Sequence, residues 1–298
     1  GSALEVDDYA LASSIVVLEG NQTGTVTLSA VLDQLDEFDE TVVIDISAVT
    51  FGIEFNPPQQ RIIIIKDDDD IPTVALSVGS VTINEEGAAT TTEIIATLSA
   101  VAGRDVTVAI GKTGTARETA TAPQSVDYTL GNSIIIPTGF PSASIILASV
   151  SDALNEFSES VIIDITGVTN GTEEGGENGQ QKIVNITDTN DPLPTVTLST
   201  ADAALNEDVG TTSTTVTVTL NTLSGKDITV ALAKGGSTRE TATAPLSIDY
   251  TLGSSIVIPE GEMTASIPLA TQGDLLNEIN ETVVIDIASV TNGVESGG

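Results

Sequence analysis

The apolar residues of this chain form short segments whose spacing favours β-strands. Val161, Ile163 and Ile165 alternate with Ile162 and Asp164, and a period of two places the two sets on opposite faces of a strand. Val, Ile and Thr are abundant, and Gly and Pro interrupt the apolar segments at short intervals, which is typical of many strands joined by turns. The pattern predicts seven strands in the middle of the chain, at residues 73–83 with a break near Gly79, 90–99, 104–111, 133–137, 143–149, 159–168 and 181–187.

Internal repeats define the organisation of the chain. The segment that starts at Pro72 recurs at Pro194, and the segment that starts at Asp127 recurs at Asp249, both with an offset of 122 residues (194 − 72 and 249 − 127). An earlier copy of the second segment starts at Asp8, at an offset of 119 (127 − 8). We therefore expect three units: residues 1–71 as the C-terminal part of a repeat, 72–191 as a complete repeat and 192–298 as a repeat that lacks its last strand.

Seven short strands with turn residues between them predict an all-β chain of tandem, seven-stranded, immunoglobulin-like β-sandwiches. Each of the three Tyr residues directly follows an Asp at the same repeat position. In a chain with 3% aromatic residues, we expect this Tyr to be a core or corner residue rather than part of a binding surface.

The charge balance narrows the range of partners. The chain has 43 Asp and Glu against nine Lys and Arg, and a formal net charge of −34. Nucleic-acid binding requires clustered cations that neutralise phosphates, so no nucleic-acid partner is expected. No apolar run is long enough to span a bilayer, so no direct membrane insertion is expected. Cys and His are both absent, which excludes thiol chemistry, a zinc site of the usual ligands and a Ser-His-Asp triad. We expect no enzymatic activity.

The acidic residues occur mostly in loops, and the predicted strand order gathers them. If the first strand of the middle repeat runs upward and each following strand reverses direction, the acidic loops all lie at the upper end. Carboxylates crowded there would repel one another unless a cation neutralises them. Oxygen ligands without His or Cys suit a hard cation, and a flexible cage of carboxylates and carbonyls suits Ca²⁺ better than Mg²⁺. The alternatives are a solvated acidic surface kept for solubility, and a catalytic metal.

The same strand order places the expected calcium at the joint between repeats. The last strand of a repeat ends at the acidic end, and the next repeat begins a few residues later. The first junction reads Asp67-Asp68-Asp69-Asp70, and the second contains Asp188 and Asp191. Calcium is therefore expected to bind where one sandwich follows another, with the neighbouring repeats of the chain as partners.

Three motifs in fixed order resemble the Calx-beta domain, a calcium-binding sandwich found in sodium–calcium exchangers, integrin β4 and many bacterial surface proteins. They are a Glu after the first strand (Glu85), a Thr-Ala-Thr segment followed by Asp127-Tyr128, and an Asp-x-Leu-Asn-Glu-x-x-Glu loop that starts at Asp152 and again at Asp274. The acidic run after the last strand completes the pattern. The resemblance covers the whole chain and implies β-sandwiches of Calx-beta type.

The resemblance also implies a ligand set for Ca²⁺ in each repeat. In the middle repeat the ligands would be Glu85, Asp127, Asp152, the Leu154 carbonyl, Glu156, Glu159 and Asp188. In the third repeat they would be Glu207, Asp249, Asp274, the Leu276 carbonyl, Glu278 and Glu281. In the first they would be Asp8, Asp33, the Leu35 carbonyl, Glu37, Glu40, Asp67, Asp68 and Asp69. The middle repeat has fewer consecutive Asp residues than calcium-sensing relatives, so fewer ions or weaker binding are expected there.

Several functions fit these features. The first is a calcium-rigidified extracellular stalk of a bacterial adhesin or gliding-type surface protein, because long arrays of similar sandwiches separate a binding tip from a cell surface. The second is a calcium sensor that signals to a linked domain, although nearly identical copies favour a stalk. The third is a set of spacer modules in a secreted hydrolase. The glycosidase interpretation of the paired carboxylates is disfavoured because the chain has no Trp to stack on a sugar.

Overall fold

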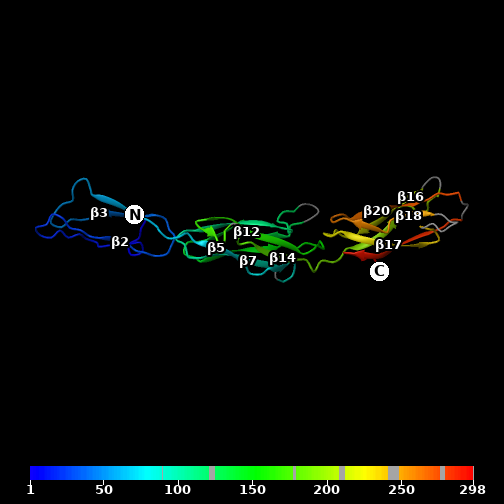
Figure 1. The fold of residues 1–298 in the computed structure, drawn as a ribbon, viewed down its shortest axis with the longest axis horizontal. Helices are drawn as coiled ribbons and strands as arrows, with labels where there is room; N and C mark the ends of the chain where they lie inside the picture. Colours follow the sequence, from blue (N-terminus) through cyan, green and yellow to red (C-terminus); the bar gives the residue numbers. More distant parts are fainter. Residues whose placement is uncertain are drawn as a thin grey trace.

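The computed structural model describes residues 1–88, 90–120, 125–176, 179–207, 212–240, 248–275 and 279–297. Every regular element in these ranges is a β-strand, and none of them contains a helix that could cross a membrane. The strands form three groups that follow one another in a single file along the long axis (Figure 1). The all-β prediction is confirmed.

The middle group is a two-sheet sandwich. One sheet has the order β10-β8-β12-β14-β6 and the other the order β13-β5-β7-β11-β9. Their strands are β5 (Thr73–Val78), β6 (Thr82–Asn84), β7 (Thr91–Leu98), β8 (Val106–Gly114), β9 (Tyr128–Thr129), β10 (Ser133–Ile136), β11 (Ser142–Ser149), β12 (Glu159–Thr169), β13 (Thr172–Glu173) and β14 (Lys182–Thr187). All seven predicted strands are present, and the sequence pattern missed only the two-residue strands β9 and β13.

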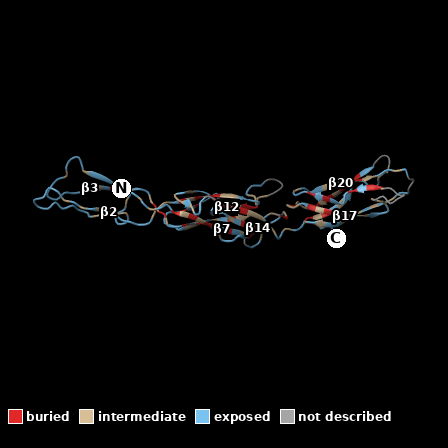
Figure 2. Cartoon of the chain, in the orientation of Figure 1, coloured by how far each residue is buried: buried red, intermediate tan, exposed pale blue. Residues whose placement is uncertain are grey.

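The core of this sandwich lies between the inward faces of the two sheets. Ile94 from β7 and Leu147 from β11 meet Val108 from β8 and Ile163 from β12, and all four are fully buried. Tyr128 belongs to the same cluster with 3% of its surface exposed, which confirms the packing role predicted for this Tyr. Figure 2 shows buried residues along the strands of the middle and third groups.

The predicted break near Gly79 is confirmed, and it lies where the chain passes from one sheet to the other. Strand β5 pairs with β7 in one sheet, whereas β6 pairs in parallel with β14 in the other, so the chain changes sheets between them. The Gly79 amide donates to the Glu93 carbonyl at 2.9 Å, and the Ser80 amide donates to Thr92 Oγ1 at 2.7 Å. These bonds satisfy the backbone at the crossing.

Strand β8 continues three residues beyond its predicted end at 111. Residues 111–114 stay paired with β12, and Lys112 Nζ donates to the Leu130 carbonyl at 2.6 Å. Gly114 then has a φ of +120°, and a Cβ there would lie 2.1 Å from the Ser160 carbonyl oxygen. The strand therefore ends where only Gly fits between two backbones.

The third group has the same arrangement without counterparts of β6 and β14 in the described residues. One sheet has the order β18-β20-β16-β15-β22 and the other the order β19-β17-β21. Its strands are β15 (Thr195–Thr200), β16 (Ser213–Leu220), β17 (Ile228–Gly236), β18 (Tyr250–Leu252), β19 (Ser255–Ile258), β20 (Thr264–Thr271), β21 (Val283–Thr291) and β22 (Val294–Glu295). Its core includes Val218, Ile228, Ile258 and the buried Tyr250.

The first group is built differently, with two small antiparallel sheets. Strands β1 (Tyr9–Leu11) and β2 (Leu28–Ala30) form one, and β3 (Glu40–Asp45) and β4 (Gln60–Ile65) form the other. Strands β3 and β4 correspond to β12 and β14, but nothing here corresponds to their other partners β8 and β6. Apolar side chains are therefore left uncovered, with Ile62 exposed by 64% and Ile64 by 59%.

Strand pairing confirms that the acidic loops of the middle repeat share one end. Glu159 at the start of β12 pairs with Ile186 near the end of β14. The end of β14 in turn pairs with the end of β6. The start of β7 at Thr91 pairs with Ala148 near the end of β11. Every loop that carries a predicted ligand in this repeat therefore opens at the same end, which we call the acidic end.

The core predicts a sharp contrast between two neighbours on β10. Ile134 has 1% of its surface exposed and Ile135 has 56%. Ile134→Ala should cost about 2–5 kcal/mol, through lost burial and the cavity it leaves. Ile135→Ala should cost less than about 1 kcal/mol. Native-state hydrogen exchange of β8 amides would measure both. Equal losses would contradict the assignment of the β10 faces.

Candidate metal centre

The end of strand β6 positions the first acidic residue. Glu85 directly follows β6, and its amide donates to the Thr187 carbonyl at 3.0 Å, which extends the parallel pairing of β6 with β14. The residue is 6% exposed. The backbone on this side is fixed further by Ser149 Oγ, which donates to the Asn84 carbonyl at 2.7 Å. Glu85 therefore projects from a rigid strand end rather than from a free loop.

The loop between β11 and β12 brings the second acidic residue to the first. The Leu154 amide donates to Asp152 Oδ1 at 2.7 Å, which makes a local turn. The Asp152 amide donates to Glu85 Oε1 at 3.1 Å. The spacing of the Asp-x-Leu motif is thus the spacing of a turn that presents the Asp152 carboxylate beside Glu85.

The linker after β14 supplies the remaining carboxylates of this group. Asp188 Oδ2 accepts the Glu156 amide at 2.5 Å, so the linker holds the β11–β12 loop. Ligand oxygens of Glu85, Asp152 and Asp191 all lie within 4.8 Å of one another. Asp191 Oδ2 is buried and has no hydrogen-bond partner among the described residues. A buried carboxylate oxygen without a donor is costly unless a cation meets it.

A second acidic group lies beside the first and contains one cation. Asp127 and Glu159 share a side-chain hydrogen bond, and Asp127 Oδ2 also accepts the Arg117 amide at 2.5 Å. The Arg117 guanidinium lies 3.6 Å from a Glu159 oxygen. Glu156 is 7% exposed and lies between the two groups, where the charges of both Asp127 and Asp152 repel its carboxylate. The acidic end of the middle repeat is therefore one continuous cluster.

Crowding and burial raise the pKa values of this cluster. Burial is the main cause for Glu85 and Glu156, whose pKa values rise to about 7. The pKa of Glu159 rises to about 8, through burial and then the hydrogen bond with Asp127. Burial, followed by repulsion from Glu86, raises the pKa of Asp191 to about 6. A divalent cation would reverse these shifts, because it favours the ionised carboxylates.

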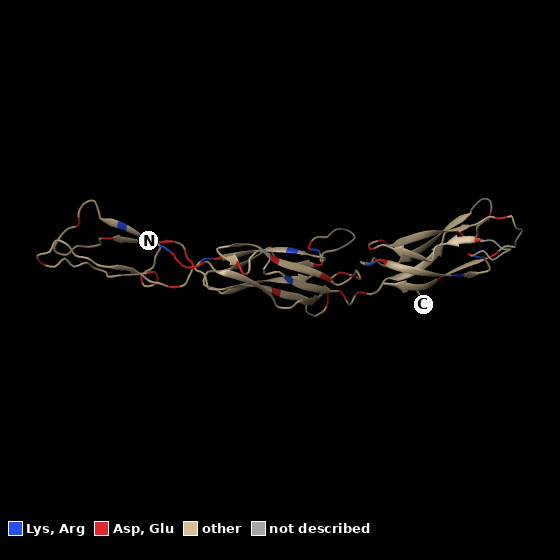
Figure 3. Ribbon diagram, in the orientation of Figure 1, with Lys and Arg blue, Asp and Glu red and all other residues tan. Residues whose placement is uncertain are grey.

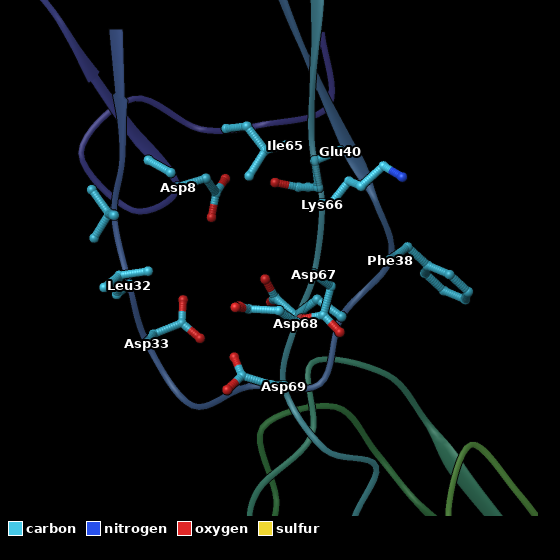
Figure 4. A pocket seen from close by; sticks show the side chains of 13 residues that line it. Asp8, Leu32, Asp33, Phe38, Glu40, Ile65, Lys66, Asp67, Asp68 and Asp69 are labelled. Atoms are coloured by element: carbon cyan, nitrogen blue, oxygen red, sulfur yellow. The ribbon is translucent and has the colours of Figure 1, made fainter.

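The first repeat gathers a similar set around a cavity of about 70 Å³. Figure 4 shows the carboxylates of Asp8, Asp33 and Glu40 turned toward the space that the Asp67–Asp69 run also lines. The Leu35 amide donates to Asp33 Oδ1 at 2.8 Å, as Leu154 does to Asp152. Burial and the nearby Asp33 raise the pKa of Glu37, and burial and a hydrogen bond with Asp8 raise that of Glu40.

The third repeat is described only in part. Asp249 Oδ2 accepts the Arg239 amide at 2.5 Å, which repeats the contact of Asp127 with Arg117. Glu207, Asp274 and Glu281 lie at the corresponding loop ends and are half-buried. The predicted ligands Leu276 and Glu278 lie outside the described residues. Within the described ranges, the structure groups three carboxylates tightly only at Glu85, Asp152 and Asp191.

Two site residues were missed as candidates in the sequence. Asp191 was noted among the loop acids but left out of the ligand set, as was Asp70, to which strand register relates it: Ile65 and Ile186 hold matching positions, and 191 − 70 equals 186 − 65. Arg117 carried no signal beyond its repetition at Arg239, 122 residues later. Its position beside Glu159 depends on the loop between β8 and β9, and sequence pattern does not define that geometry.

The donor set fits a hard cation. Carboxylates and backbone carbonyls are the ligands Ca²⁺ prefers, and the described cluster offers an unpartnered oxygen together with several ionisable groups whose protonation a cation would displace. Figure 3 shows acidic residues gathered at both places where one group of strands follows another. The acidic end and the junction between repeats are the same place.

No protein family and no curated protein matches the sequence. Similar solved structures include the calcium binding domain CBD12 of CALX1.1, with a TM-score of 0.29 and 17% identity over 69% of this chain and 76% of that chain. The apo form of the Calx CBD1 domain has a TM-score of 0.30 and 16% identity, over 40% of this chain and 99% of that one. A two-domain protein of unknown function from Bacteroides fragilis has a TM-score of 0.27 and 9% identity, over 67% and 88%. These similarities are too low to assign a function or a family to this chain. The sandwich fold described above is assigned from the strand pairing.

The raised pKa values predict how calcium-free stability depends on pH. Glu85, Glu156, Glu159 and Asp191 bind protons more tightly when folded, with pKa values of about 6 to 8. Their protonation therefore stabilises the fold fully below the unfolded pKa values, and that stabilisation is lost as pH rises through the folded values. In chelator, the melting midpoint of the middle sandwich should fall between about pH 5 and about pH 8.5.

Glu159→Gln serves as the matched variant for this pH profile. It removes the group with the highest of these pKa values, so the fall in midpoint should be shallower than in the wild type. Differential scanning calorimetry in chelator measures both profiles. A midpoint that stays flat or rises over this range would show that the acidic end is solvated rather than buried.

Proposed function

We propose that the acidic end of each repeat binds Ca²⁺ and that the chain is a non-enzymatic segment of a rigid extracellular stalk in a bacterial surface protein. The observation that carries the calcium proposal is the convergence of Glu85, Asp152 and Asp191, with the buried Asp191 Oδ2 left without a partner. The raised pKa values of the surrounding carboxyls add a second reason. Burial and repulsion disfavour their charged forms, and a divalent cation would relieve both effects.

Two features support a structural role for the ion. The ligand candidates come from the end of β6, from the β11–β12 loop and from the linker, so one ion would tie three separate segments together. The linker is also short, from the end of β14 at Thr187 to the start of β15 at Thr195. An ion held by Asp191 would therefore fix the linker as well as the sandwich, and a fixed linker stiffens an array of repeats.

The placement on a cell surface rests on chemistry and shape. The chain has no Cys and a net charge of −34. Bound metal ions would therefore cross-link its loops and stabilise the fold, as disulfides do in many secreted domains. Its strand groups stand in single file (Figure 1). Such an array separates what is attached to its two ends, and millimolar calcium outside cells would keep low-affinity sites occupied.

Calcium sensing is the second candidate, because the buried carboxylates would change charge on binding. Spacer modules of a secreted hydrolase are the third. Isothermal calorimetry separates the first two: a stalk site should have a Kd of about 10⁻⁴–10⁻³ M, whereas a sensor site should bind at about 10⁻⁶ M or tighter. Submicromolar binding would overturn the stalk assignment in favour of sensing.

Calcium should raise the melting midpoint of the middle sandwich. At a calcium concentration about 100-fold above Kd, one site contributes about 2.7 kcal/mol, which corresponds to roughly 10 °C for a sandwich of this size. Glu156→Gln with Glu159→Gln should remove most of the shift, and should slightly raise the calcium-free midpoint because two repelling carboxylates are lost. Scanning calorimetry with calcium and with chelator measures both effects.

Asp164→Asn provides the control for this experiment. Asp164 lies on β12 opposite Gly111, away from the acidic end, so its substitution should leave the calcium-induced shift intact. A wild-type midpoint that calcium does not move would rule out a stabilising site.

Calcium should also stiffen the chain. Small-angle scattering in calcium should give a maximum dimension that matches the single file of Figure 1, with little flexibility. Chelator should increase flexibility, because the linker carboxylates then repel one another. Identical scattering under the two conditions would reject the stiffening by calcium while leaving calcium binding itself open to the calorimetric test.

A further inference from the structure

The same contact joins the repeats at both junctions. At the first, the Gly103 amide donates to the Asp36 carbonyl at 3.0 Å; at the second, the Gly225 amide donates to the Asn155 carbonyl at 3.2 Å. In each case the acceptor belongs to the acidic loop of the preceding repeat, and the donor to the loop before β8 or β17 in the following one. The two junctions differ in sequence, so this repetition is a feature of the repeat rather than of one linker.

The residue after each glycine adds a cation to the contact. Arg104 Nε donates to Asp36 Oδ2 at 3.1 Å, and its Nη2 forms an ion pair with Asp36 Oδ1. Lys226 Nζ donates to Asn155 Oδ1 at 2.7 Å. Asp36 is 3% exposed in this pair, so its carboxylate depends on the guanidinium for neutralisation.

An aromatic ring completes each contact. The Arg104 guanidinium lies 4.8 Å from the centroid of Phe38, and Lys226 Nζ lies 5.0 Å from that of Phe157. Both distances are within cation–π range. The rings account for a feature that the core does not explain, because Phe38 and Phe157 are 67% and 63% exposed and yet occur at matching positions (157 − 38 = 119).

The glycines are required by the fit of the two loops. A Cβ on Gly103 would lie 2.3 Å from Glu37 Cγ, and a Cβ on Gly225 would lie 2.3 Å from Glu156 Cγ. Neither glycine has a positive φ, so the requirement is one of space rather than of backbone conformation. The following repeat therefore inserts a bare backbone beneath the side chain of a glutamate in the preceding loop.

The polar pairs are matched, and differ between the junctions. Asp36 offers two oxygens to the fork of Arg104, a geometry that Lys cannot reproduce. Asn155 uses its amide twice: Oδ1 accepts from Lys226, and Nδ2 donates to the Asp191 carbonyl at 3.2 Å. An Asp at position 155 could not make the second bond. Each acidic loop is therefore fitted to the loop that follows it.

We propose that these two loops form a plug and socket by which each repeat recognises its neighbour. The plug is Gly103-Arg104 or Gly225-Lys226, and the socket is Asp36-Glu37-Phe38 or Asn155-Glu156-Phe157. The partner that a socket fits is another repeat with a Gly-cation plug, and the Asp–Arg or Asn–Lys pair selects which one. The contact is made by protein groups alone, so it goes beyond calcium binding and favours one relative orientation of neighbouring repeats even without an ion.

The third repeat carries a different socket sequence. At the position of Phe157 it has Ile279 (157 + 122 = 279), which offers no π-face to a cation. A repeat with a Gly-cation plug should therefore dock less tightly on this socket than on the other two.

Distance measurements across each junction of the full chain test the proposal. The chain has no Cys, so spin labels can be placed at Ser29 and Ser144 for the first junction, and at Ser144 and Thr215 for the second, all of which are exposed. Pulsed electron resonance in chelator then gives the distribution of inter-repeat distances. Chelator keeps the result independent of calcium binding.

Plug variants should broaden one distribution and leave the other unchanged. Gly225→Val should broaden the second junction, and Arg104→Gln should broaden the first. Loss of a charge-assisted hydrogen bond should lower the ratio of docked to undocked repeats roughly tenfold or more. Unchanged distributions for both variants would overturn the proposal, as would equal broadening of the two junctions by either variant.

The selectivity is tested by exchanging one pair for the other. Asp36→Asn should broaden the first distribution, and Asp36→Asn with Arg104→Lys should narrow it again toward the wild type. A double variant as broad as Asp36→Asn alone would overturn the matched-pair claim. If these results hold but calcium leaves the melting midpoint unmoved, the recognition stands and the proposed calcium function fails.

Discussion

Repulsion among carboxylates at one end of each sandwich is the constraint on which the rest of this structure depends. Up-and-down strands bring Glu85, Asp127, Asp152 and Glu159 to the same end because each lies at or near the end of a strand there. Burial adds a desolvation cost to the charged carboxylates, and the pKa values of Glu85 and Glu159 are raised as a result. Whenever no divalent cation is bound, apolar burial in the sandwich cores has to offset the repulsion that Arg117 and protonation leave unbalanced.

The constraint also accounts for the positions of three basic residues of the chain. Arg117 stands beside Glu159 within the cluster, and Arg104 and Lys226 reach into the acidic loops of preceding repeats. With nine basic residues against 43 acidic ones, protein cations neutralise only part of the charge. What remains is balanced by protonation, by counterions or by a bound divalent ion, and these differ in how strongly they order the loops.

Much of the fold was predictable because it depends on local patterns. Alternation along residues 159–168 gave β12, and Gly79 marked the point where the chain changes sheets. The grouping of the acids followed from strand order, without any knowledge of distances. The sequence could not show that Asp191 rather than Asp188 completes the tight group, because the path of the linker past the β11–β12 loop decides it. The role of Gly103 was equally invisible, since it depends on contact with Glu37, 66 residues earlier in the chain (103 − 37).

The parallel pairing of β6 with β14 determines how the middle repeat would bear mechanical load. The chain enters the sandwich at the start of β5 and leaves at the end of β14, at opposite ends of the domain. Tension along the array therefore pulls β6 and β14 in opposite directions along their own axes. The pairs Thr82–Asn185, Ile83–Ile186 and Asn84–Thr187 are then sheared together instead of opening one at a time. Because all of these bonds must break at once, the force needed to unfold the middle repeat is set by the whole ladder, at the end where the acidic residues gather.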